Sequence, residues 1–301
     1  RAGAVLGTAL AIKMIAYVAV APIAGAFAEV LPRRAMLVSL DLVRAVVALC
    51  LPFVTEIWQV YVLIFLLQAA SAGFTPAFQA VIPDVLTEDV ADLGVGMMLM
   101  QARGMLGAET WVRDGSWAAK GGYPLQRKVW GKRAGVLGLG RIGMAVARRL
   151  VGFGMTVAYS ATSPKAEAAG WDYVPDPVAL AAQSDFLFVT LAATAATRHI
   201  VDARVIAALG PEGMLINISR AANIDEEALL TALESGGLGA AALDVFEGEP
   251  KLNPRFLALG NVLLQPHHAS GTFETRRAMG QLLRDNLGAH FDGRPLPTPV
   301  L

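Results

Sequence analysis

Three glycines with a fixed spacing constrain this chain more than any other feature. Gly138, Gly140 and Gly143 form a G-x-G-x-x-G turn between an apolar run, 134–137, and an amphipathic run, 141–150. In a strand–turn–helix, the first glycine permits the tight turn, the second lets a phosphate approach the backbone, and the third lets helix and strand pack closely. The helix N-terminus then offers unpaired N–H groups and the positive end of a dipole. The sequence therefore predicts a dinucleotide site.

The alternative is an ordinary glycine-rich turn, and the segments that follow argue against it. The expected strands are 156–159, 185–191, 214–218, 240–245 and 262–265. The expected helices are 177–183, 202–209, 225–235 and 272–291. Asp225 is suited to cap the third of these helices, and Gly236-Gly237 is suited to end it. This alternation is typical of an α/β fold with a Rossmann-type, doubly wound parallel sheet.

Charge and hydropathy divide the chain into two parts. The 301 residues carry no formal net charge, so composition gives no indication of a nucleic-acid partner. The single cysteine, Cys50, excludes an internal disulfide framework and suits a reducing compartment. Few charged side chains precede Pro83, although the chain as a whole is 55% hydrophobic. We therefore expect two domains, 1–83 and 84–301, in different solvents.

The first domain contains three long apolar stretches. They are residues 4–28, 35–54 and 57–78. Each meets the roughly 20-residue length of a transmembrane helix, and three in succession are not a signal peptide. The alternative is a buried helical core in a soluble protein. Lys13, Asp41 and Arg44 would each cost about 2.5–3.5 kcal/mol at mid-membrane, so they should face other helices or a water-filled path.

The two linkers between these stretches differ in charge. Linker 29–34 holds two arginines, whereas linker 55–56 holds no basic residue. Because basic loops stay on the cytoplasmic side, the first linker and everything after residue 78 should face the cytoplasm. The sequence thus predicts a cytoplasmic-membrane partner through residues 4–78 and a cytoplasmic second domain.

Residues 1–83 resemble part of the major facilitator transporters. The matching motifs are Gly25-x3-Glu29-x3-Arg33-Arg34, Asp41-Leu-Val-Arg44 and Thr75-Pro-Ala-Phe-Gln-Ala-x-Ile-Pro83. The resemblance implies an all-α, three-helix transmembrane segment, with Glu29 where the family usually has Asp. A facilitator needs two helix bundles around a central site, so we do not expect this segment to transport by itself.

Three polar residues follow expected strands of the second domain, where such sheets place their ligands. Arg220 follows strand 214–218, Glu249 follows 240–245, and His267 follows 262–265. Reduction of a ketone needs a proton donor, which a histidine supplies near neutral pH. An arginine holds an adjacent carboxylate with two parallel hydrogen bonds. A glutamate beside the histidine would favour its charged form and raise its pKa.

Each of these residues also has a simpler interpretation. Arg220 could form a surface ion pair, Glu249 beside Glu247 could lie in a solvated loop, and His267 or His268 could be a loop histidine with a local partner. Their order on one sheet edge favours the catalytic interpretation. The sequence shows no metal-ligand motif among them.

Residues 84–301 strongly resemble the D-isomer-specific 2-hydroxyacid dehydrogenases, especially the glyoxylate and hydroxypyruvate reductase branch. The matching motifs are Gly138-Leu-Gly-Arg-Ile-Gly143, Asn217-Ile-Ser-Arg220, Asp244-Val-Phe-Glu-Gly-Glu-Pro250 and Pro266-His-His-Ala-Ser-Gly-Thr-x-Glu-Thr-Arg276. The resemblance implies that Arg220 orients a small 2-oxo acid, that His267 is the acid/base, and that Glu249 is its partner. It places these residues at the cofactor: Gly138, Gly140, Arg141, Ile142, Gly143, Thr197, Ile218, Arg220, Asp244, His267 and Ser270. Ala221 stands where the family usually has glycine, a departure expected to tighten the loop.

The end of the second strand bears on which nicotinamide cofactor, NAD or NADP, would bind. An NAD enzyme has an acidic residue about 20 residues past the glycine turn to bind the ribose hydroxyls. Here the segment 159–165 contains no acid, and Ser160, Thr162, Ser163 and Lys165 are able to hold a 2′-phosphate. The arginine common in NADP-using relatives is missing. We expect NADP to be favoured over NAD.

The resemblance also bears on the segment between the two parts. Family members begin with a flavodoxin-like lobe whose loop amides hold the substrate carboxylate, and we expect this lobe to be missing here. The available residues suffice for a helix at 88–106, an arm at 107–131 that helps form a homodimer in the family, and the first strand. Segment 82–92 is compatible with either parent family, which suggests recombination or an assembly or gene-model chimera.

Three functions follow from these observations. The first is an oxidoreductase that transfers a hydride between NAD(P)H and a small 2-oxo acid such as glyoxylate or hydroxypyruvate, with activity weakened or lost because the substrate lobe is missing. The second is a membrane-tethered dinucleotide-binding chimera without turnover. The third is a transporter fragment.

Overall fold

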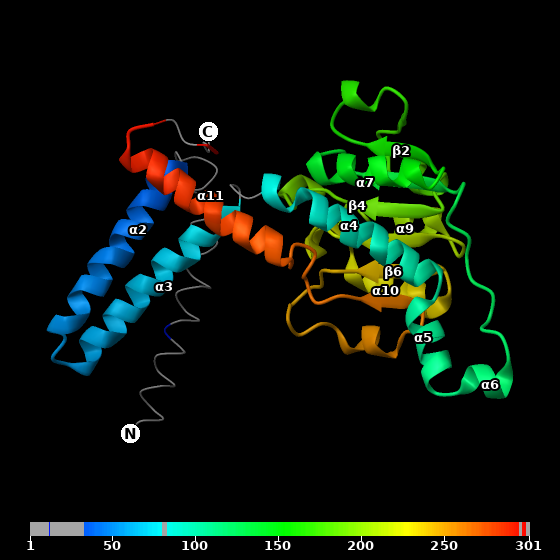
Figure 1. Cartoon of the computed structure of the whole chain (residues 1–301), viewed down its shortest axis with the longest axis horizontal. Coiled ribbons are helices and arrows are strands. Elements are labelled where there is room, and N and C mark those ends of the chain that lie inside the picture. The colour runs from blue at the N-terminus through cyan, green and yellow to red at the C-terminus, as the bar shows by residue number, and fades with distance from the viewer. Residues whose placement is uncertain (1–11, 13–32, 80–82, 295–296, 299–301) are drawn as a thin grey trace. The chain divides into compact units, whose positions relative to one another are not determined.

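The structure is a computed structural model that describes residues 12, 33–79, 83–294 and 297–298 (Figure 1). The chain separates into two compact units. One comprises residues 1–85 and 277–301, and the other comprises residues 86–276.

The first unit contains a pair of helices in the region expected to cross a membrane. Helix α2 (Arg33–Cys50) leads through a short 3₁₀ turn, 51–53, to helix α3 (Ile57–Gln79), and the two helices pack against each other (Figure 1). They correspond to the expected stretches 35–54 and 57–78. The first expected stretch, 4–28, lies outside the described residues apart from Ile12.

The expectation of membrane-spanning helices finds no support in this part of the chain. Among the described residues, no helix combines the length and the apolarity needed to cross a membrane. Charge interrupts α2, where Arg44 Nη1 donates to Asp41 Oδ1 at 3.2 Å across one helical turn.

The second unit is built on a seven-stranded parallel sheet in the order β3-β2-β1-β4-β5-β6-β7. The strands are β1 (Arg133–Leu137), β2 (Thr156–Ser160), β3 (Asp172–Tyr173), β4 (Phe186–Val189), β5 (Met214–Asn217), β6 (Ala240–Leu243) and β7 (Val262–Leu264). The chain moves outward from β1 in one direction and then returns to β4 on its other side. This order confirms the predicted Rossmann-type, doubly wound fold.

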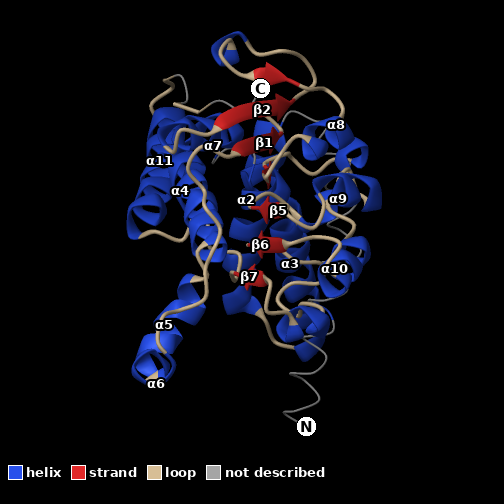
Figure 2. Cartoon of the chain, turned by 90° about the vertical axis from the view of Figure 1, so that its right-hand side faces the viewer, coloured by secondary structure: helices blue, strands red, loops and turns tan. Residues whose placement is uncertain are grey.

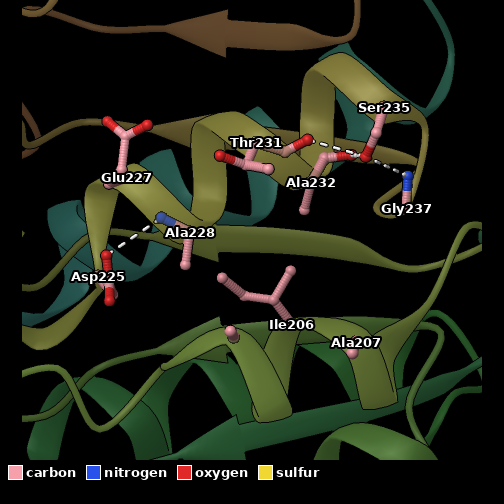
Figure 3. Close-up of a pocket in the computed structure, with 10 residues that line it drawn as sticks. Ile206, Ala207, Asp225, Glu227, Ala228, Thr231, Ala232, Ser235 and Gly237 are labelled. Carbon is pink, nitrogen blue, oxygen red and sulfur yellow. Dashed lines mark hydrogen bonds between the residues drawn. The ribbon is translucent and has the colours of Figure 1, made fainter.

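Alternate residues of the central strands enter two separate cores, as expected for a sheet covered on both faces. On β4, Phe186 and Phe188 face one core, whereas Leu187 and Val189 face the other, and all four are fully buried. The first core is completed by helices α4 (Pro83–Ala102) and α7 (Arg141–Gly152). The second is completed by α8 (Pro177–Ala182), α9 (Ala203–Leu209) and α10 (Glu226–Ser235) (Figure 2).

Helix ends follow the local sequence signals in most places. Asp225 caps α10 by accepting the Ala228 N–H at 3.1 Å, and Gly236 leaves the helix in a left-handed conformation at φ 74°. The expected helix 88–106 is wrong at both ends, because α4 begins at Pro83 and ends at Ala102. Gly104, at φ 55°, then separates α4 from α5 (Met105–Arg113).

The segment expected to form an arm consists of α5, the short α6 (Ser116–Lys120) and an extended return to β1. Trp111 Nε1 donates to Gly121 O at 3.0 Å, and its ring packs edge-on against Tyr123 with centroids 5.8 Å apart. Several large apolar side chains of the segment nevertheless remain exposed. They are Met105, Leu106, Val112, Trp117, Leu125 and Trp130.

Candidate active site

The glycine turn between β1 and α7 needs each of its glycines for a different reason. Gly138 has φ 103°, and a Cβ there would lie 2.9 Å from the Leu191 backbone nitrogen. A Cβ on Gly143 would lie 2.1 Å from Gly138 O, so only glycine lets α7 approach the turn this closely. A Cβ on Gly140 would meet nothing within 4 Å. That open space, at the N-terminus of α7, fits the approach of a phosphate group.

Thr190, which the sequence did not indicate, stabilises this turn. It directly follows β4, the strand that pairs with β1. Its Oγ1 donates to Gly138 O at 2.6 Å, while Gly138 N donates to Ser160 O at 2.9 Å. No local sequence pattern marks Thr190, because its role depends on the pairing of β4 with β1 in the sheet. On α7, Arg141 is exposed and Ile142 packs partly buried against the first core.

The end of β2 contains no carboxylate, as expected for a site that receives a 2′-phosphate. Thr162 and Ser163 are exposed, and Lys165 is half-buried. Ser160 differs from the expectation, because it is buried and its Oγ donates to Pro175 O at 3.0 Å. Its single hydroxyl proton is therefore used in a hydrogen bond within the protein.

Thr197 lies in a 3₁₀ turn after β4 that contains its own capping box. The Thr197 hydroxyl donates to Ala192 O at 2.7 Å, and Thr194 N donates to Thr197 Oγ1 at 2.8 Å. Two residues later, His199 adopts φ 50° and donates its backbone N–H to Ala222 O at 2.8 Å. The turn after β4 is thus attached to the turn after β5.

The turn after β5 is held by buried amide and hydroxyl groups. Asn217 Oδ1 accepts from Ser219 N at 3.0 Å and from Ser219 Oγ at 2.8 Å, and Asn217 Nδ2 donates to Arg220 O at 3.2 Å. Asn223 Nδ2 donates to Ser219 Oγ at 3.0 Å. This network leaves the Arg220 side chain exposed, with Nη1 donating to Ser219 O at 2.7 Å. Ile218 is buried in the first core.

Asp244, at the end of β6, organises the loop that carries the histidines. It is buried, and its two carboxylate oxygens accept from His268 N at 2.9 Å and from Ala269 N at 3.0 Å. Through these two hydrogen bonds, Asp244 fixes the start of the loop after β7. Ser270 follows directly and is half-buried.

A histidine and a glutamate form a hydrogen-bonded pair at this edge. His267 Nδ1 lies 2.6 Å from Glu249 Oε2, and Glu249 Oε1 accepts from Phe246 N at 2.7 Å. A carboxylate accepts, so Nδ1 carries the proton and Nε2 is left for another partner. His268 is engaged elsewhere, with Nε2 2.7 Å from Gln265 Oε1.

The sheet brings the three candidate residues to one edge. Asn217, Leu243 and Leu264 are partners in register on β5, β6 and β7. Arg220, Glu249 and His267 follow these positions, beyond the carboxyl ends of three adjacent strands. Glu249 and His267 are in direct contact, whereas the hydrogen bond of Arg220 is to its own neighbour. The arrangement can hold an anion beside a histidine whose proton is oriented.

The comparisons with known proteins agree with this geometry. The family model of the D-isomer specific 2-hydroxyacid dehydrogenase, NAD binding domain, matches residues 95–269. The chain belongs to this family. The Major Facilitator Superfamily model matches residues 2–107, so the two matches overlap at 95–107. Both resemblances drawn from the sequence are confirmed, as are the dehydrogenase class and a nicotinamide dinucleotide as cofactor.

Three relatives match between 72% and 80% of the chain. A glyoxylate/hydroxypyruvate reductase A of Arabidopsis thaliana is 48% identical over 219 residues, which are 73% of this chain and 69% of the relative. The structure of a 2-hydroxyacid dehydrogenase from Ketogulonicigenium vulgare is 63% identical, covers 80% of both chains and has a TM-score of 0.73. An NADPH-dependent glyoxylate/hydroxypyruvate reductase from Sinorhizobium meliloti, solved with NADP and malonate, is 46% identical. That match covers 72% of this chain and 68% of the relative, with a TM-score of 0.69.

Proposed function

We propose that this chain carries an NADPH-linked reductase site for a small 2-oxo acid of the glyoxylate or hydroxypyruvate type. The observation that supports this most directly is the His267–Glu249 pair, 2.6 Å apart, on the same sheet edge as Arg220. The names of the relatives from Arabidopsis thaliana and Sinorhizobium meliloti support the substrate class.

Each residue has a separate role in this proposal. Arg220 binds the substrate carboxylate, because a guanidinium can hold both of its oxygens. The Nδ1–H of His267 is directed at Glu249, so Nε2 faces the ketone oxygen and donates a proton as the alkoxide develops. Glu249 stabilises the protonated ring and fixes its orientation. When bound, the nicotinamide supplies the hydride.

The dinucleotide would lie along the carboxyl edge from the glycine turn to the dyad. Gly140, Arg141, Ile142 and the α7 N-terminus would receive its phosphates, with Gly138 and Gly143 shaping that turn. Thr197, Ile218, Asp244 and Ser270 would line or support the rest of the site. Thr162, Ser163 and Lys165 would hold the 2′-phosphate, which supports a preference for NADP over NAD.

A pair of neighbouring histidines provides the decisive test of the reaction. We expect the purified chain to oxidise NADPH with hydroxypyruvate, and His267→Asn to lower kcat by about 10²- to 10⁴-fold. His268→Asn is the matched control, since its ring contacts Gln265 instead, and it should retain most of the activity. Equal losses in the two variants would overturn the assignment. NADPH binding without any turnover would favour the alternative, a dinucleotide-binding chimera.

We further propose that the boundary between the two parts lies near residue 83 and that residues 1–83 attach the cytoplasmic reductase domain to a membrane. The Major Facilitator Superfamily match supports this, as do large exposed apolar side chains on α2 and α3 such as Leu49 and Trp58. After expression, the chain should stay with the membrane pellet in alkaline carbonate. Release of the whole chain into the supernatant would contradict the proposal.

The exposed apolar side chains of segment 107–131 support a homodimer as a further proposal. Trp117 is 62% exposed and Leu125 is fully exposed. Exposure of such apolar surface to water is unfavourable, and a second copy of the chain would cover it. Light scattering in detergent should give a dimer for the wild type and a monomer for Trp117→Asp. An unchanged mass for that variant would argue against this interface.

A further inference from the structure

The turn that carries Glu249 is held by a second carboxylate from outside it. Within the turn, Phe246 N donates to Glu249 Oε1 at 2.7 Å, and Gly248 adopts φ 74°. Glu247 N, between these two residues, donates to Glu226 Oε2 at 2.9 Å. Glu226 is the first residue of α10, so one helix start is joined directly to the loop after β6.

We propose that Glu226 is a positioning residue for the His267–Glu249 pair. The hydrogen bond from Glu247 N to Glu226 fixes the backbone path of the turn. The turn in this conformation holds the Glu249 carboxylate against His267 Nδ1. The inference rests on the proposed function for its kinetic consequence, although the geometry it concerns is independent of turnover.

Burial and charge show that Glu226 is not an ordinary surface acid. Burial raises its pKa, and the nearby carboxylates of Glu247 and Glu227 add to this, while the hydrogen bond from Glu247 N opposes it. Burial and the neighbouring carboxylates thus disfavour the ionised form of Glu226, whereas the hydrogen bond from Glu247 N favours it.

The Glu247 side chain lies close to the turn after β4. Its Oε1 lies 3.7 Å from His199 Nε2, a buried ring nitrogen with no hydrogen-bond partner. His199 in turn donates its backbone N–H to Ala222 O. Glu247 therefore contacts the turn after β4 through its side chain and the start of α10 through its backbone N–H.

A simpler role for Glu226 would be to complement the dipole of α10, since acidic residues stabilise a helix N-terminus. Glu227 provides the matched control for that role. It is also in the first turn of α10, but its carboxylate accepts from Arg255 Nη1 at 2.6 Å, away from the Glu249 turn. Loss of either glutamate removes one charge from the helix start, and only loss of Glu226 releases the turn.

The test compares Glu226→Ala, Glu226→Gln and Glu227→Ala in the full chain. Glu226→Ala should lower kcat with hydroxypyruvate by about 10- to 100-fold, because small misplacement of a catalytic group is costly, and leave the KM for NADPH within about twofold. Glu226→Gln keeps an acceptor oxygen for the Glu247 N–H and should restore kcat. Glu227→Ala should retain the wild-type kcat. Equal losses in Glu226→Ala and Glu227→Ala, or no rescue by Gln, would overturn the proposal.

A spectroscopic measurement decides the question without turnover. The hydrogen-bonded Nδ1–H of His267 should give a downfield proton resonance, identified by its absence in His267→Asn. We expect this signal to be lost or broadened in Glu226→Ala and present in Glu226→Gln and Glu227→Ala. An unchanged signal in Glu226→Ala would refute positioning. A wild-type chain without turnover would refute only the proposed function, because the resonance would still report on the pair.

Discussion

Alanine substitutions at Gly143 and Gly140 should separate the stability of the glycine turn from its binding role. The Cβ of Gly143→Ala would lie 2.1 Å from Gly138 O and 2.8 Å from Thr190 Oγ1, where ordinary contacts begin near 3.4 Å. Helix α7 and the turn must therefore separate by more than about 1 Å. Overpacking of this kind costs about 1–3 kcal/mol, and contact with a backbone atom places the variant at the upper end.

The expected loss can be converted into a melting temperature. For a folding unit the size of 86–276, each kcal/mol shifts Tm by roughly 2–4 °C, so a loss of about 3 kcal/mol lowers Tm by about 6–12 °C. Gly140→Ala should behave in the opposite way. Its backbone, at φ −81° and ψ −162°, is accessible to alanine, and the added methyl group meets no protein atom within 4 Å. Its Tm should be unchanged or slightly higher.

Ligand binding then distinguishes the two variants. NADPH at 100 times its Kd should stabilise the wild type by about 2.7 kcal/mol, which corresponds to a Tm increase of roughly 5–11 °C. Gly140→Ala should lose this increase, because its methyl group occupies the space assigned to the phosphates. Differential scanning calorimetry with and without NADPH measures both effects. A Gly143→Ala chain with wild-type Tm, or a Gly140→Ala chain that NADPH still stabilises fully, would refute the reasoning.

Three further substitutions test the sheet and the site. The hydrogen bonds and charge of Arg133 hold the pKa of Asp185 below its usual range, so its stabilising contribution is complete above about pH 4 and lost at lower pH. Asp185→Asn should therefore reduce stability at pH 7 and flatten its decline in acid, as measured by urea unfolding across pH; an unaltered slope would contradict this. Thr190→Val removes the hydroxyl that donates to Gly138 O and should cost about 1 kcal/mol by the same unfolding assay, with no change if that bond is dispensable. Lys165→Ala should weaken NADPH binding roughly tenfold in calorimetric titration and leave NADH binding unaffected, whereas equal losses would place Lys165 away from the 2′-phosphate.

The apolar runs in the sequence predicted every strand of the sheet except β3. Apolar runs such as 214–218 are long enough to specify buried strands without knowledge of their neighbours. Strand β3 escaped detection because its two residues, Asp172 and Tyr173, have no apolar pattern and become a strand only by pairing with Ala158 and Tyr159 on β2. Local sequence cannot show an edge strand that is defined by its partner.

The candidate site was predictable where a residue type directly reflects its chemistry. Glycines in a turn and a histidine after a strand are such cases, and the His267–Glu249 contact agrees with the expected partnership. Thr190 and Glu226 were not predictable, because each acts on a backbone group of a segment distant in sequence. An ordinary threonine or glutamate gives no compositional signal of that contact. Ser160, expected at the phosphate, is instead used by the fold.

The sheet order has a consequence for how this family can be rearranged. The glycine turn, Asp244 and the paired His267 and Glu249 all derive from one uninterrupted stretch, 133–272, in which each strand adds its loop to the same edge. The glycine turn and the His267–Glu249 pair are thus encoded in one continuous segment of the gene. Recombination upstream of residue 133 therefore replaces the preceding segment and leaves this whole stretch of the sheet unaltered.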